Sequence, residues 1–149
     1  MDKISEFSLQ VFELNGLFIG IGDAALKPLG ITSAKWQVLG TASMGKAQLS
    51  VPHIAKLIGQ SRQATQKTAN DLVRLGLAEF HENEFHKKSK LFVPTQKGLD
   101  THKLALEIWM KISNSIISQI APDELLRAIK INDELIGILR KINGGNHDK

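Results

Sequence analysis

Residues 51–75 read VPHIAKLIGQSRQATQKTANDLVRL, and this stretch predicts two helices joined by a tight turn. Ala55 is a small residue within the first helix, and Gly59 follows it at the turn. The helices of a helix-turn-helix cross at roughly 90–120°, so they need a small side chain at the crossing and a turn residue that tolerates positive φ. The stretch is therefore predicted to be a helix-turn-helix, and the wedge between its helices is expected to contain Ile54, Ile58, Thr68 and Leu72.

The second helix of this motif is predicted to begin after Ser61, which is its expected N-cap. Its inner side is expected to hold Ala64, Thr68, Leu72 and Leu75, and its outer side Arg62, Gln63, Thr65, Gln66, Lys67 and Asn70. In the major groove of DNA, Arg and Lys pair with guanine, Gln pairs with adenine and the Thr methyl contacts thymine. The outer face therefore favours DNA binding, and the alternative is an ordinary helical hairpin with a solvated face.

A small β-hairpin is predicted directly downstream. Residues 77–81 alternate like a strand, residues 91–93 form the returning strand, and Pro94 ends it. Positions 56–97 hold eight basic and four acidic residues, whereas the rest of the chain holds eleven of each. A basic patch of this kind favours a polyanion such as DNA; the alternative is a solvated lysine-rich surface.

Long amphipathic helices are predicted at both ends of the chain. Residues 4–26 carry apolar side chains on two faces, and glycines at 16, 20 and 22 predict a bend or fraying near 20–22. A second long helix is predicted from Thr95 to the break at Pro122, and a last one follows it. A helix with two apolar faces needs two partners, so we expect a stable dimer whose interface is built from both termini.

Length and composition exclude several classes of protein. The chain has 149 residues, the size of one domain, and no cysteine for a disulfide or a thiolate metal site. No apolar run reaches the roughly 18–20 residues of a membrane span, and the N-terminus lacks the basic region of a signal peptide, so a cytoplasmic location is expected. No spacing supports a catalytic set, so neither enzymatic activity nor a cofactor is predicted. A metal at His81, Glu82, Glu84 and His86 is not predicted either, because an exposed hairpin tip is a poor metal cage.

The chain resembles the MarR family of bacterial transcription regulators, which are winged helix-turn-helix dimers. The resemblance lies in GITSAKWQVLGTA at 30–42, LSVPHIAKLIGQSRQATQKTANDLVRLGLAEF at 49–80 and KKSKLFVPTQKG at 87–98. It implies a mainly α fold in which residues 1–149 form one domain. Residues 31–98 would be the winged helix-turn-helix DNA-binding lobe, and residues 1–30 and 99–149 would be the dimerisation helices.

The resemblance also implies how DNA is bound. The helix that follows Ser61 would enter the major groove, and the hairpin, as the wing, would reach the adjacent minor groove. The expected DNA-binding residues are Ser61, Arg62, Gln63, Thr65, Gln66, Lys67, His86, Lys87, Lys88 and Lys90. Typical members carry Asp-x-Arg in the wing, where this chain has His86-Lys87-Lys88. Lys88 keeps the charge without the planar fork of Arg, and His86 supplies no carboxylate to brace the wing, so a looser tip that binds through charge is expected.

Family members often respond to small molecules, so the resemblance implies a ligand-responsive repressor that acts as a homodimer on a pseudo-palindromic operator. A small aromatic or anionic effector is expected near Phe18, Trp36 and Trp109, and the alternative for these aromatic residues is core packing. A second hypothesis for the whole chain is a winged-helix protein-interaction module that does not bind DNA. The basic surfaces of the recognition helix and the hairpin argue against it.

Overall fold

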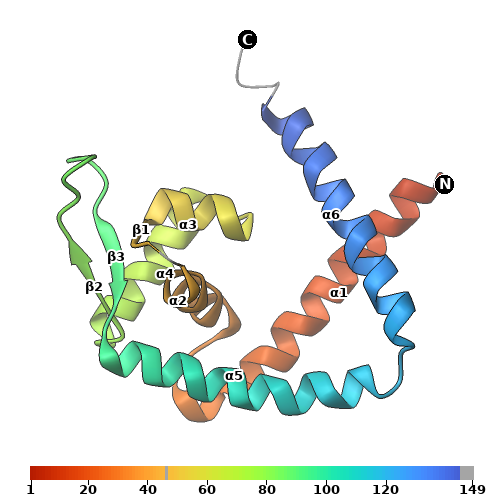
Figure 1. Ribbon diagram of the computed structural model, residues 1–149, viewed down its shortest axis with the longest axis horizontal. Helices are drawn as coiled ribbons and strands as arrows, with labels where there is room; N and C mark the ends of the chain where they lie inside the picture. The colour runs from red at the N-terminus through yellow and green to blue at the C-terminus, as the bar shows by residue number, and fades with distance from the viewer. Residues whose placement is uncertain (46, 145–149) are drawn as a thin grey trace. The chain divides into compact units, whose positions relative to one another are not determined.

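The computed structural model describes residues 1–45 and 47–144. The elements are α1 (Lys3–Leu26), the short 3-10 helix η1 (Lys27–Leu29), α2 (Ser33–Met44), β1 (Leu49–Ser50), α3 (Val51–Ile58), α4 (Arg62–Arg74), β2 (Ala78–His81), β3 (Leu91–Pro94), α5 (Gln96–Ile117) and α6 (Pro122–Gly144) (Figure 1). The chain divides into two compact units, Met1–Trp109 and the part from Met110 onward, and α5 runs from one into the other. The fold is thus mainly α with a small sheet, as predicted.

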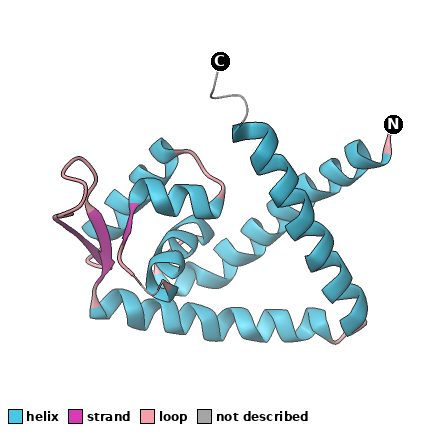
Figure 2. Cartoon of the chain, turned by 45° about the horizontal axis from the view of Figure 1, so that its top comes forward, coloured by secondary structure: helices cyan, strands magenta, loops and turns pink. Residues whose placement is uncertain are grey.

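The core of the first unit lies between the helices and a three-stranded antiparallel sheet. The three strands lie in the order β1-β3-β2 (Figure 2). Phe92 on the central strand is fully buried, and it pairs with Leu49 of β1 and Phe80 of β2. The other fully or almost fully buried apolar side chains of this core are Leu26, Ile31, Val38, Leu39, Val51, Ile54, Ala69, Leu72, Leu77, Ala78 and Ala105. The predicted hairpin is confirmed, and β1 is an addition that the sequence analysis missed.

Helix α1 is continuous through its glycines. Its N-cap Asp2 accepts hydrogen bonds from the backbone N–H groups of Ile4 and Ser5, and the helix ends only at Leu26. A Cβ at Gly22 would overlap the hydroxyl of Ser33, which itself donates to the carbonyl oxygen of Ile19 at 3.1 Å. The predicted fraying near positions 20–22 is therefore wrong, because this glycine allows α1 to pack closely against α2.

The first turns of α5 are held against the sheet and α2 by two further close approaches. A Cβ at Gly98 would overlap the backbone carbonyl group of Leu77, and a Cβ at Gly40 would lie 3.0 Å from Cε1 of His102. Beside Gly40, the indole N–H of Trp36 donates to Nδ1 of His102 at 3.1 Å. Burial lowers the pKa of His102 below its ordinary value, which keeps Nδ1 available as an acceptor.

The second unit contains the end of α5 and all of α6. Pro122 is the first residue of α6, where its missing N–H costs no hydrogen bond. Asp123 and Glu124 follow in the first turn, where negative charge is favourable. No residue of α6 is buried, and its large apolar side chains include Leu126, Leu139 and Ile142, each at least 60% exposed. Within its own unit, this helix therefore leaves much of its apolar surface uncovered.

By length and composition, the stretch Lys3–Leu29 is also apolar enough to cross a membrane, contrary to the expectation from its sequence. The exposed side chains along α1 include Leu9, Phe12 and Leu17. One such helix is weak evidence for a membrane span, because core helices of soluble proteins and signal sequences pass the same test.

Gly98→Ala is expected to destabilise the first unit by about 1–3 kcal/mol, because the new methyl group would overlap backbone rather than a movable side chain. Gly16→Ala is the matched control: it also lies within a helix, and nothing approaches its Cβ position within 4 Å. This control should be neutral or stabilising by up to about 1 kcal/mol. Urea unfolding of the three proteins measures the difference, and equal midpoints would contradict the close approach.

His102 is expected to lower stability in mild acid. At high pH the ring is neutral in both states; as the pH falls below the ordinary imidazole pKa, the unfolded chain takes up the proton first, so the free energy of unfolding decreases. His102→Asn removes the titration and retains a side-chain acceptor for Trp36. The wild type should therefore lose more stability than this variant between about pH 7.5 and about pH 5.5, measured by urea unfolding. A difference that is constant with pH would contradict this account.

Candidate nucleic-acid interface

The turn between α3 and α4 sets the position of the recognition helix. Gly59 adopts a left-handed conformation with φ of 69°, and the N–H of Gln60 returns to the carbonyl oxygen of Ala55 at 3.0 Å. The hydroxyl of Ser61 then accepts from the backbone N–H of Ala64 at 3.1 Å, so α4 begins at Arg62. The predicted helix-turn-helix and its N-cap are both confirmed.

Polar and basic side chains cover the outward face of α4. Arg62, Gln63, Gln66 and Lys67 are all exposed, as is the N-cap Ser61. The amide nitrogen of Gln66 donates to Oδ1 of Asn70 at 2.9 Å, one turn along the same face. Further along, Asp71 binds Arg74 on the same helix and Lys35 of α2, the latter at 3.8 Å. The exposed polar and basic surface that a partner could contact therefore includes the first two turns of α4.

Thr65 does not belong to this surface, and its predicted contact with a base is wrong. The side chain is fully buried, and its hydroxyl donates to the carbonyl oxygen of Ser61 at 2.9 Å. Thr65, Ala69 and Leu72 form the buried side of α4, whereas Ala64 is exposed. The buried face of α4 is thus shifted by about one residue along the sequence relative to the predicted face. Thr can face a core in this way because its hydroxyl bonds to the preceding turn of its own helix.

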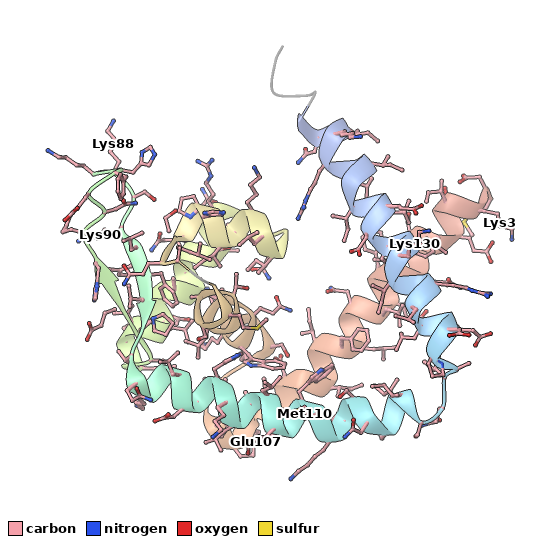
Figure 3. The ribbon with its side chains drawn as sticks, in the orientation of Figure 1. Lys3, Lys88, Lys90, Glu107, Met110 and Lys130 are labelled. Carbon is pink, nitrogen blue, oxygen red and sulfur yellow. The ribbon has the colours of Figure 1, made fainter. Side chains whose placement is uncertain are left out.

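The wing carries the other group of basic residues. His86, Lys87, Lys88 and Lys90 are exposed in the loop between β2 and β3. Figure 3 shows Lys88 at the tip of the hairpin and Lys90 on the arm that leads into β3. Nζ of Lys90 lies 3.7 Å from a carboxylate oxygen of Glu82, across the loop. The hairpin and the recognition helix belong to the same compact unit, so this unit presents two basic surfaces.

Asn83 organises the wing loop, a role that the sequence analysis missed. Its side-chain nitrogen donates to the carbonyl oxygen of Ser89 at 3.0 Å, and its side-chain oxygen accepts from the N–H of Phe85 at 3.1 Å. These bonds connect the two arms of the loop without a carboxylate at His86. The known preference of Asn for turns was the available signal. Phe85 was missed as well: it is 91% exposed in this loop.

The three aromatic residues predicted for an effector site come together in the first unit. The ring centroids of Phe18 and Trp109 are 6.0 Å apart, and those of Trp36 and Trp109 are 5.9 Å apart. They line a partly open cavity of about 330 Å³, together with Asn15, Ile19, Gly22, Ser33 and Gln37. None of the three rings is fully buried. Of the three, Trp36 alone packs directly against the core, so core packing does not account for the whole cluster.

Within residues 1–45 and 47–144, no group of three or more His, Asp or Glu side chains is placed to hold a metal ion. In the wing, Nε2 of His81 instead lies 3.2 Å from a carboxylate oxygen of Glu79.

Comparisons with known proteins agree with this geometry. Residues 29–89 match the model of the MarR family. The uncharacterized protein Rv2011c of Mycobacterium tuberculosis is 36% identical over 124 residues, which cover 83% of this chain and 85% of that protein. Among solved structures, AbsC, a MarR family transcriptional regulator from Streptomyces coelicolor, has a TM-score of 0.79 at 19% identity, and the match covers 95% of this chain and 97% of AbsC.

Two structures from Staphylococcus aureus are also similar in fold. A MepR–DNA complex has a TM-score of 0.80 at 16% identity, and the match covers 89% of this chain and 97% of MepR. A MarR in complex with salicylate and kanamycin has a TM-score of 0.77 at 16% identity, and the match covers 92% of each chain. The members of this family are transcription regulators rather than enzymes. This chain belongs to the MarR family and has the winged helix-turn-helix fold of its DNA-binding regulators.

Proposed function

We propose that this protein is a transcriptional repressor that binds a pseudo-palindromic operator as a homodimer and is released from it by a small molecule. The observation that carries the proposal is the pairing of two exposed basic surfaces in one unit: the start of α4, with Arg62, Gln66 and Lys67, and the wing, with Lys87 and Lys88. The basic side chains of these two surfaces are not arranged as the catalytic residues that an enzyme would need. A protein-interaction module that does not bind DNA would not require their positive charge.

Each surface is suited to a different part of DNA. The exposed amides and guanidinium of α4 have the donors and acceptors that read base edges in the major groove. Lysines of the wing supply positive charge without a planar fork, which suits phosphates and the narrow minor groove. MepR, which has a similar fold, was solved as a complex with DNA, and this supports the same role here.

The apolar surface of the two terminal helices supports a dimer. On α1, Phe12 is 72% exposed, and Leu9 and Leu17 of the same helix are exposed as well. Helix α6 has no buried residue at all. Apolar surface of this extent is unfavourable in water, and a second copy of the chain would cover it. A dimer would also present two recognition helices to half-sites about one helical turn apart.

The aromatic cavity supports control by a ligand. It lies next to α2, which packs directly on α3 and α4, so a bound molecule has a physical route to the recognition helix. The Staphylococcus aureus MarR complex contains salicylate and kanamycin, and ligand binding by that protein makes the same expectation reasonable here. A regulator of this kind acts on the chromosome, and we place it in the cytoplasm.

The recognition helix and the wing are expected to contribute differently to binding. After operator fragments are selected with the purified protein, Arg62→Ala or Gln66→Ala should cost about 1–3 kcal/mol on the operator and relax preference at one or two base pairs. The double variant Lys87→Ala/Lys88→Ala should weaken binding to all sequences similarly, and lower the salt slope by about 0.9 for each phosphate that the wing no longer neutralises. Salt titrations by fluorescence anisotropy, on operator and on random DNA, measure both effects.

Lys103→Ala/Lys111→Ala is the control, since it removes the same charge from exposed positions on α5. It should leave the salt slope closer to that of the wild type than the wing variant does. If the wing variant loses sequence discrimination and the α4 variants lose only salt dependence, the two surfaces are assigned the wrong way round. Wild-type protein that selects no DNA fragment would leave the protein-interaction module as the better hypothesis.

The wild type is expected to sediment as a dimer at micromolar concentration, with an interface larger than roughly 1,600 Å². Phe12→Glu should shift it toward monomer, because a carboxylate would be placed in the apolar interface of α1. Phe85→Glu is the matched control, since that ring is even more exposed but lies in the wing. A monomeric wild type, or equal effects of the two variants, would contradict the dimer through the terminal helices.

A further inference from the structure

We infer that the aromatic cavity of the first unit selects planar aromatic cations over aromatic anions. This inference rests on the proposed ligand site and specifies its chemistry. It starts from the composition of the cavity wall: three aromatic rings, two amides, a hydroxyl, and no basic side chain, in the set Asn15, Phe18, Ile19, Gly22, Ser33, Trp36, Gln37 and Trp109. A carboxylate ligand would leave water here without finding an opposite charge, which is unfavourable.

The arrangement of the rings suits a cation. Trp109 lies between the other two, with ring centroids 6.0 Å from Phe18 and 5.9 Å from Trp36, at interplanar angles of 59° and 54°. Tilted rings at this spacing can present more than one π face to the same small ligand. A cation within about 6 Å of such a face is attracted by the ring quadrupole, and Trp gives the strongest attraction.

Part of the hydrogen-bonding capacity of the wall is already used within the protein. The indole N–H of Trp36 donates to His102, and the hydroxyl of Ser33 donates to the carbonyl oxygen of Ile19. The side-chain oxygen of Gln37 accepts from the amide of Gln60 at 3.3 Å. The donors that the wall still offers, on Asn15, Gln37 and Trp109, are neutral N–H groups. An anion would therefore meet dipoles but no opposite charge, and the ring faces remain the surface that favours a cation.

A negative charge lies next to the wall. Asp23, which is half-buried on α1, accepts the backbone N–H of Ser33 at 2.6 Å, and its neighbour Gly22 lines the cavity. Among the described residues, Asp23 takes part in no salt bridge. Lys35, the basic residue beside Trp36 in the sequence, is paired with Asp71 on α4. The nearby charge is thus unneutralised and negative, which raises the affinity for a cation and lowers it for an anion.

Both tryptophans of the chain line this cavity, and the chain has no tyrosine. Intrinsic fluorescence therefore reports on the cavity without a background from elsewhere. The test titrates the full-length protein, in the absence of DNA and at about pH 7.5, with three probes of nearly equal shape: N-methylquinolinium, quinoline and quinoline-2-carboxylate. Titration of N-acetyltryptophanamide corrects for collisional quenching, and calorimetry gives an independent dissociation constant.

The expected order of affinity is N-methylquinolinium, then quinoline, then quinoline-2-carboxylate, with at least about a tenfold gap between the cation and the carboxylate. Asp23→Asn keeps the acceptor for Ser33 but removes the charge, so it should weaken the cation about threefold or more and leave quinoline unchanged. Asp100→Asn is the matched control: it removes one negative charge from an exposed position on α5 outside the cavity wall. It should leave all three dissociation constants close to those of the wild type.

Carboxylate binding as tight as cation binding, equal effects of Asp23→Asn and Asp100→Asn, or the absence of binding by all three probes would each overturn the inference. Because these titrations contain no DNA, their outcome is independent of the proposed regulation. If the cation binds as expected but leaves operator affinity unchanged in a separate anisotropy measurement, the cavity chemistry stands and the coupling to DNA does not.

Discussion

The left-handed turn at Gly59, followed at once by the Ser61 cap, is the constraint on which the DNA-binding surface depends. The turn ends α3 at Ile58, and the cap fixes the residue at which α4 begins. With the start of α4 fixed, the periodicity of the helix decides that Thr65, Ala69 and Leu72 face the core. Arg62, Gln66 and their polar neighbours then face outward. A residue with a Cβ at position 59 would be strained at this φ, and every side chain of the recognition face would be affected.

The elements of the fold could be predicted because their signals are local. Ser61 before a polar helix and Gly59 after an apolar helix each indicate a helix boundary through their immediate neighbours in the sequence. The rotation of α4 was predicted less well, since Ala64 and Thr68 give as plausible an apolar stripe as Thr65 and Ala69. What decides between them is packing against α2 and α3, which lie elsewhere in the sequence. The strand β1 was missed for a similar reason. It is only two residues long, and it is a strand only because it pairs with Leu91 and Phe92, which lie about forty residues later in the sequence.

The aromatic cluster illustrates a site that a sequence indicates but does not define. Phe18, Trp36 and Trp109 belong to three different helices, and no spacing along the chain brings them together. Their meeting depends on Gly22, whose missing side chain lets α1 approach Ser33 of α2. It depends as well on Gly40, which leaves room for His102 and so for the adjoining turn of α5. Gly22 and Gly40, which look like weak points of their helices, are positions at which two helices touch.

Asp71 has a consequence for the length of the DNA contact. Its carboxylate, held by Lys35 and Arg74, lies near the end of α4, on the side that also carries Gln63, Gln66 and Lys67. The two cations outweigh this one carboxylate, so a phosphate brought close to this end of the helix would meet a net positive charge, with the guanidinium of Arg74 as its most exposed group. In the proposed complex, the C-terminal end of the recognition helix would therefore contact the DNA backbone, and the reading of bases would be left to its N-terminal turns. The footprint of each subunit on the bases would be short, and the number of base pairs between half-sites would matter more to affinity than additional sequence within them.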